Sequence, residues 1–533
     1  MASPRTAASP QTAAIPRTAT VRSPRLSWLV PVATFVALFL VCSAWSLATP
    51  ISGGPDESGH IIKAAASARG IWTGTPTDRA GIEQFVLPAN VADVGEPMTC
   101  FAFHPERSAA CAPSLDNASA GDVVVETGVG SYNPLYYVIV GWPSLLLTGE
   151  PAIYAMRLVS GLLTASTLTL MFWAASVLTN GSRYLLAALT VALTPMVYFL
   201  GGVINPNGLE SAGVAAFVVL LWLVLSRTNT SPTALVGLAA VTAVVANLRS
   251  TSPLYLLLAA LAVVTAVGGP RAIGTFRQGW VLVAAAAATG AAGLGALWTL
   301  TVALPAGFIP SSGNTRDDVV TAVGATFGKS TDYARELVGV FGWLDTPLPD
   351  WIYALWAAMV GAVLVGGLAL AGRGRLVAIC IGLASLALIP AAIQAPSAAE
   401  YGYIWQGRYS LPLFVTAIIV AGVGVALTIN GAGARAARRV LVILAISAAA
   451  AQCTAFVATL YRYTVGDEAE FAEMFDAPQW LPPGDLMIPM LLCGAGAIGL
   501  CAVVLLGGGD RGRMPRTPPP STAVRSRPRH SAS

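Results

Sequence analysis

Apolar runs alternate with short polar stretches along most of the chain. Thirteen such runs lie between residues 27 and 507. They cover 27–49, 134–149, 155–178, 184–202, 209–226, 234–248, 252–269, 279–303, 351–371, 376–394, 409–429, 440–462 and 486–507. Because about 20 apolar residues in a helix match the hydrocarbon core of a bilayer, this pattern predicts an all-α integral membrane protein.

The distribution of arginine predicts the orientation of the spans. Loops on one side carry arginine and no acid, and the residues after 507 contain six arginines and one aspartate. Arginine marks the cytoplasmic side, so both termini are expected there, which requires an even number of spans. The run 134–149 is short and contains Pro134 and Pro143. We therefore expect it to be an amphipathic helix at the outer membrane surface, which leaves about twelve transmembrane helices.

This topology divides the chain into a membrane domain and two tails. Residues 27–507 form the polytopic membrane domain, with large outer segments at 50–154 and 304–350. Residues 1–26 and 508–533 are rich in Pro, Ser and Arg, and we expect disordered cytoplasmic tails there, the second one basic.

Two cysteines lie in the polar part of the first outer segment. Cys100 and Cys111 have ten residues between them. An oxidising location outside the cytoplasm would allow a disulfide between these two residues.

Composition supports the membrane assignment and excludes other classes. Apolar residues make up 55% of the 533 residues and charged residues only 11%. Soluble domains carry about 25% charged residues, so a soluble enzyme, a nucleic-acid-binding protein and a disordered scaffold are excluded. Of the 30 basic residues only Lys63 and Lys329 are lysine, which is typical of a high-GC, actinobacteria-like genome and points to a bacterial plasma membrane.

The first candidate site directly follows the first span, in Pro55-Asp56-Glu57-Ser58-Gly59-His60. Asp56 and His60 are four residues apart and would share one face of a helix. A carboxylate at the outer surface can act as a general base on an acceptor hydroxyl, with Glu57 as the alternative to Asp56. His60 could orient the carboxylate or help Asp56 to bind a divalent ion. Alternatively, acids in a first helical turn only complement the helix dipole.

Further polar side chains fall at the same outer ends of the predicted spans. They are Tyr132, Asn133, Asn205, Arg249, Trp343, Asp345, Gln406, Arg408 and Tyr409. Arg408, together with Arg249, would suit a lipid phosphate, because a guanidinium matches phosphate oxygens. Trp343 and Tyr132 would shape a sugar pocket. Each residue also has a structural interpretation as an interfacial anchor, a turn or a helix cap.

The order of these motifs resembles that in the DUF2142 family of bacterial polytopic membrane proteins. The resemblance rests on Pro55-Asp56-Glu57 with His60, Asn133-Pro134-Leu135-Tyr136-Tyr137, Asn205-Pro206-Asn207, Gly342-Trp343-Leu344-Asp345 and Gln406-Gly407-Arg408-Tyr409. That family is similar to GT-C glycosyltransferases, which have an acidic motif in the first outer loop and polyprenyl-phosphate-linked sugar donors. The resemblance implies that Asp56 or Glu57 replaces that motif. In the 201–208 turn, where a second acidic motif would be expected, this chain has Asn205 and Asn207.

The predicted function is transfer of a sugar from a polyprenyl-phosphate donor to an extracytoplasmic glycan or protein acceptor in the cell envelope. A transporter or flippase for envelope lipids or polysaccharides is the main alternative. It predicts a polar lining that continues to the cytoplasmic side. A non-catalytic assembly protein is the third interpretation, and it predicts that Asp56 and Arg408 face away from any shared pocket.

Overall fold

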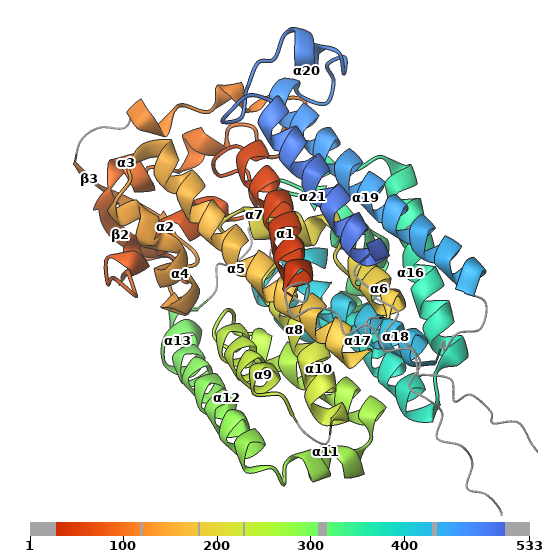
Figure 1. The fold of residues 1–533 in the computed structure, drawn as a ribbon. Helices are drawn as coiled ribbons and strands as arrows, with labels where there is room; N and C mark the ends of the chain where they lie inside the picture. Colours follow the sequence, from red (N-terminus) through yellow and green to blue (C-terminus); the bar gives the residue numbers. More distant parts are fainter. Residues whose placement is uncertain are drawn as a thin grey trace, which may run out of the picture.

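Long apolar helices make up most of the computed structural model (Figure 1). It describes residues 28–506, apart from 118–120, 180–181, 228–229, 308–316 and 429–433. The predicted tails at 1–26 and 508–533 lie outside the described residues.

Nine helices of the described chain are long and apolar enough to cross a bilayer. They are α1 (Leu29–Ala48), α5 (Gly149–Leu178), α8 (Pro206–Ser226), α12 (Gly279–Trp298) with its continuation through η6 (Thr299–Ala303) and α13 (Leu304–Ala306), α16 (Asp350–Leu370), α17 (Arg373–Tyr401), α18 (Leu411–Thr428) with the preceding η7 (Gly407–Ser410), α19 (Ala434–Val465) and α21 (Met487–Leu506). This confirms the prediction of an all-α membrane domain.

Two pairs of helices raise the number of candidate spans to as many as eleven. α6 (Arg183–Ala192) and α7 (Pro195–Gly202) are bent by 66°, and α10 (Ser252–Val267) and α11 (Gly269–Thr275) by 107°. Pro195 lacks the N–H that would continue α6, and Gly268 adopts a positive φ of 98°. The run predicted at 234–248 forms α9 (Pro232–Val245), whose 14 residues are too few for this test.

A layer of short elements covers one end of the bundle. It contains α2 (Glu57–Ala68), α3 (Ala89–Ala92), α4 (Pro134–Gly141), the turns η2 (Glu96–Thr99), η3 (Ala109–Cys111), η4 (Leu115–Asn117) and η5 (Trp142–Leu145), and the strands β1 (Thr75–Pro76), β2 (Glu83–Pro88) and β3 (Asp122–Thr127). Figure 1 shows α2, α3, α4, β2 and β3 together at this end, and α11 at the other. We call this set of elements the outer layer.

The small sheet in the outer layer was not predicted from the sequence. Its antiparallel order is β1-β2-β3, and the β2–β3 register runs from Glu83 opposite Thr127 to Pro88 opposite Asp122. Within β2 the burial alternates, with Phe85 buried and Val86 59% exposed. That alternation is the expected pattern of a strand with one face against a core.

α4 corresponds to the run that we excluded from the spans. Its eight residues are too few to cross a bilayer. Tyr136 and Tyr137 point into the protein, whereas Leu135, Val138 and Ile139 are exposed. The apolar face of this surface helix is therefore directed outward, where it can contact lipid.

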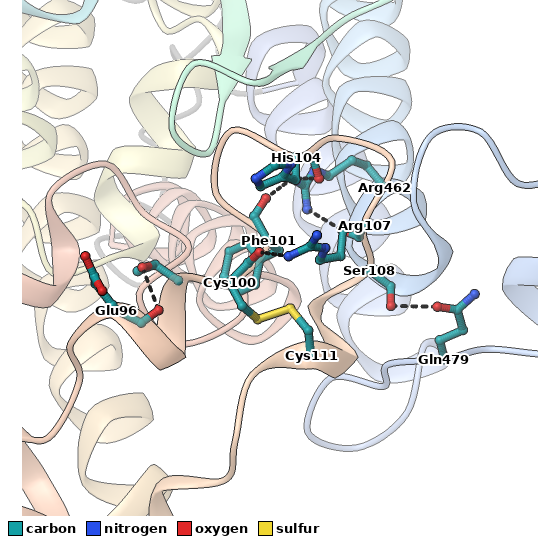
Figure 2. Close-up of a disulfide and its surroundings, with 10 residues drawn as sticks. Glu96, Cys100, Phe101, His104, Arg107, Ser108, Cys111, Arg462 and Gln479 are labelled. Atoms are coloured by element: carbon teal, nitrogen blue, oxygen red, sulfur yellow. Dashed lines mark hydrogen bonds between the residues drawn. A yellow bond between two sulfur atoms is a disulfide. The ribbon is translucent and has the colours of Figure 1, made fainter.

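Elements from later in the chain complete the same end of the molecule. They are α14 (Val319–Gly328), α15 (Ser330–Gly339), the strand pair β4 (Val340–Phe341) and β5 (Thr346–Pro347), and α20 (Glu473–Asp476). The structure joins Cys100 and Cys111 in a disulfide, as Figure 2 shows. The closed loop packs against the end of α19, where Arg462 donates a hydrogen bond to the carbonyl of Phe101 at 2.7 Å.

Candidate functional site

A cavity of about 880 Å³ lies between the outer layer and the ends of the long helices. Seven of the residues singled out in the sequence line it: Asp56, Tyr132, Asn133, Arg249, Trp343, Gln406 and Tyr409. The other walls come from the turn between α9 and α10 and from the ends of α12 and α17. All of these segments lie at the end of the bundle that carries the outer layer.

Asp56 is the N-cap residue of α2, and its side chain is 49% exposed. Its backbone is left-handed, with φ of +58°, a conformation that aspartate tolerates better than most residues. The preceding turn is held close to the α7–α8 connection. A Cβ on Gly54 would come within 3.0 Å of Val203, and the Asn205 amide donates a hydrogen bond to the Pro55 carbonyl at 2.9 Å. Asn205 therefore positions Asp56 but does not line the cavity.

Arg408 pairs directly with Asp56. Its Nη2 lies 2.6 Å from Asp56 Oδ2 and also donates to the Tyr409 hydroxyl at 3.0 Å. The Arg408 side chain is only 2% exposed, and its Nε and Nη1 have no hydrogen-bond partner among the residues that the structure describes. Burial alone would raise the pKa of Asp56, but the positive charge of Arg408 holds it below the usual value, so Asp56 is ionised at neutral pH.

Arg249 approaches the same tyrosine from the α9–α10 turn. Its guanidinium carbon is 4.6 Å from the centre of the Tyr409 ring, and that of Arg408 is 5.0 Å away. Arg249 Nη1 also donates to Asn207 Oδ1 at 2.6 Å. Two cations thus meet around one aromatic ring beside the cavity, an arrangement suited to an anionic ligand.

Glu210 was missed in the sequence analysis. It lies in the first turns of α8, is fully buried, and accepts a hydrogen bond from the Ser252 hydroxyl at 2.5 Å. Its Oε2 is 3.7 Å from Arg249 Nη1, so it helps to fix that guanidinium. The sequence did contain a signal for Glu210, since it is an acid inside an apolar run. An ionisable side chain at membrane depth is costly and therefore suggests a functional role.

Glu57 does not reach the cavity. Arg157 binds both carboxylate oxygens, with Nε–Oε1 at 2.7 Å and Nη2–Oε2 at 2.5 Å, and both side chains are fully buried. The backbone N–H groups of Gly54 and Ile204 donate to the same carboxylate. Arg157 also donates to the carbonyls of Ser46, Thr49 and Pro50. This pair joins the end of α1 to α5 and the α7–α8 connection.

His60 is also buried, beneath Asp56. Its Nδ1 lies 2.8 Å from the Tyr137 hydroxyl, and its ring stacks on that of Tyr137. Burial lowers the pKa of His60 to about 3, so the imidazole is neutral. Among the described residues no three His, Cys, Asp or Glu side chains are grouped to hold a metal ion. Within the described chain Asp56 and His60 therefore lack a third such ligand, and the pair does not fit a divalent ion.

Asp345 has a structural position outside the cavity. Its Oδ2 accepts hydrogen bonds from the Phe103 N–H at 2.8 Å and from Arg462 at 3.2 Å. Its Oδ1 accepts from the Trp343 N–H, and Trp343 Nε1 in turn donates to the Ser52 carbonyl at 3.1 Å.

Asn133 caps α4 and donates to Asn247 Oδ1 at 3.0 Å. These contacts fix the cavity walls formed by Trp343 and Asn133.

A comparison with known families places most of the chain in one family of predicted membrane proteins. No protein with a curated description matches this chain. The solved structures include ArnT from Cupriavidus metallidurans bound to undecaprenyl phosphate, which is similar with a TM-score of 0.43 and 13% identity over 89% of this chain and 76% of that chain. The model of the family of predicted membrane proteins named DUF2142 matches residues 39–417. The chain belongs to the DUF2142 family.

Proposed function

We propose that this protein is a membrane glycosyltransferase. It moves a sugar from a polyprenyl-phosphate donor to an acceptor of the cell envelope outside the cytoplasm. The observation that carries the proposal is the half-exposed carboxylate of Asp56 in a cavity that also contains Arg249, with the buried cation Arg408 bound to that carboxylate. A base for the acceptor and cations for the leaving phosphate are the two requirements of direct sugar transfer.

In the proposed reaction the acceptor oxygen attacks the anomeric carbon while the bond from that carbon to the phosphate oxygen breaks. Asp56 takes the acceptor proton, and the bond electrons leave with the lipid phosphate. Arg408 and Arg249 stabilise the negative charge that develops on this phosphate. A phosphate that engages Arg408 also weakens the Arg408–Asp56 ion pair, which raises the pKa of Asp56 and makes it a better base.

The position of the cavity supports this function over transport. Its lining comes from helix ends and loops on the side of the outer layer. A transporter would need polar lining that continues to the opposite end of the bundle. An assembly protein would have Asp56 and Arg408 facing away from any shared pocket, whereas Asp56 lines the cavity and binds Arg408 at 2.6 Å. We propose that this end faces outward from a bacterial plasma membrane, with both termini cytoplasmic, as the arginine distribution predicts.

The proposal is tested with the full-length protein in lipid vesicles. We expect it to consume at least one polyprenyl-phosphate sugar, releasing lipid phosphate and forming a glycosylated envelope product that mass spectrometry detects. Movement of the lipid-linked sugar across the vesicle membrane without covalent change would instead show a transporter. Binding of a lipid-linked glycan with neither movement nor turnover would show an assembly protein.

Arg408→Gln tests the proposed role of that arginine in binding the donor phosphate. We expect kcat/KM for the donor to fall about 10- to 100-fold, the usual effect of losing hydrogen bonds from a charged group. Arg335→Gln is the matched control, because Arg335 is 46% exposed and pairs with Asp350 away from the cavity. Equal donor kinetics for the wild type and Arg408→Gln would remove Arg408 from the phosphate site.

A further inference from the structure

Phe103 is held in an unfavourable position by its surroundings. Its side chain is 68% exposed, and its backbone adopts a positive φ of 62°, which is rare for a bulky residue. The left-handed backbone costs free energy, so this conformation depends on the contacts that surround it. The function proposed above gives Phe103 no role.

Three sets of contacts hold the loop that presents Phe103. The disulfide between Cys100 and Cys111 closes it. The buried Arg462 donates to the carbonyls of Phe101 at 2.7 Å and His104 at 3.1 Å, residues labelled in Figure 2. The Phe103 N–H donates to Asp345 at 2.8 Å. The loop is therefore fixed before any ligand arrives, which reduces the entropic cost of binding.

The Phe103 ring is continuous with the cavity through Trp343. The two ring centres are 5.7 Å apart and their planes are tilted by 59°. Trp343 lines the cavity that contains Asp56 and is itself fixed by its bond to Ser52. The exposed Phe103 and the partly buried Trp343 thus lead from the surface to the proposed reaction centre.

The surroundings of Phe103 favour a carbohydrate over a lipid. The exposed side chains of His104 and Glu106 lie 3.2 Å apart in the same loop, and both can bond hydroxyl groups. The adjoining segment 463–485 has six acids and no base, and its Asp467 N–H donates to the Pro105 carbonyl. These acids would repel anionic headgroups. A sugar ring presents an apolar C–H face to an aromatic ring and hydroxyls at its edge, which matches both kinds of group.

We propose that Phe103 and Trp343 form a stacking platform for a glycan acceptor. The glycan lies over the Cys100–Cys111 loop, and its terminal sugar reaches into the cavity toward Asp56. This inference rests on the proposed glycosyltransferase function and assigns its acceptor to the carbohydrate class.

The kinetic test is Phe103→Ala in the full-length protein. We expect KM for a glycan acceptor to rise about 3- to 10-fold, the usual effect of losing an aromatic stacking contact, with kcat and the donor KM unchanged. Phe103→Trp should keep the wild-type KM. Phe475→Ala is the control, because Phe475 is 49% exposed on the same side and contacts Phe471 instead. An acceptor KM that Phe103→Ala leaves unchanged would overturn the inference.

Binding by calorimetry separates this inference from the proposed function. The probes are short oligosaccharides released from the envelope of the host bacterium. Binding that weakens in Phe103→Ala and in Cys100→Ser, without sugar transfer by the wild type, would support the platform and contradict the glycosyltransferase. Sugar transfer with oligosaccharide affinity independent of Phe103 would contradict the platform and leave the glycosyltransferase in place.

Discussion

Asp56→Asn is expected to lower kcat for sugar transfer by about 10²- to 10⁴-fold, the usual contribution of a general base. The amide keeps the shape of the carboxylate and can still accept a hydrogen bond from Arg408, but it cannot take the acceptor proton. Asp56 is half exposed but its partner Arg408 is only 2% exposed, so loss of this charge also lowers stability, and thermal unfolding measures that part of the effect separately. The measurement is product formation at saturating donor and acceptor, with thermal unfolding of both proteins in lipid.

The matched control for this variant is Asp93→Asn. Asp93 is an exposed acid of the outer layer that does not line the cavity. Its variant should transfer sugar at the wild-type rate. Full activity of a normally folded Asp56→Asn protein would show that Asp56 is not the base.

Glu57→Gln should destabilise the protein by about 3–5 kcal/mol, because it leaves the buried Arg157 without a countercharge. This loss of stability follows from burial, because Glu57 and Arg157 are both fully buried. In the variant, water cannot reach the unpaired Arg157 guanidinium to replace the lost carboxylate. Expression yield and thermal unfolding in lipid measure the effect. If Glu57 were the catalytic base instead, its variant would fold normally and fail only in turnover.

An exposed ion pair provides the comparison for Glu57→Gln. Arg79 and Glu126 form a pair in which the Arg79 side chain is 64% exposed. Arg79→Gln should change stability by no more than about 1 kcal/mol, because water and salt screen such a pair. A similar loss for both variants would contradict the role of burial.

Most of the membrane fold could be predicted because each span is a local feature. An apolar run of sufficient length identifies a helix such as α8 without reference to its neighbours. Bends within the apolar runs were harder to predict from the sequence. The run 184–202 reads as one span, although Pro195 divides it into α6 and α7. The sheet of the outer layer was missed because β2 and β3 are short and pair across more than thirty residues of polar sequence.

The residues of the candidate site could be predicted from the sequence, but the contacts between them could not. Asp56 and Arg408 were both identified, yet their contact joins residues 352 positions apart in the sequence, one at the start of α2 and the other in η7. Asp56 and Glu57 are adjacent in sequence and were treated as alternatives. The structure directs Asp56 to the cavity and buries Glu57 against Arg157, because consecutive residues at the start of a helix point in different directions.

The close packing of α1 against α21 has a consequence for biogenesis (Figure 1). A Cβ on Gly496 of α21 would lie 2.6 Å from Val41 and 2.7 Å from the carbonyl of Ala37 on α1. Translation delivers α1 to the membrane long before α21. The face of α1 that contacts α21 must therefore be covered by lipid or by an insertase until nearly the whole described chain has been synthesised. We expect premature termination before α21 to leave that face of α1 without its protein partner.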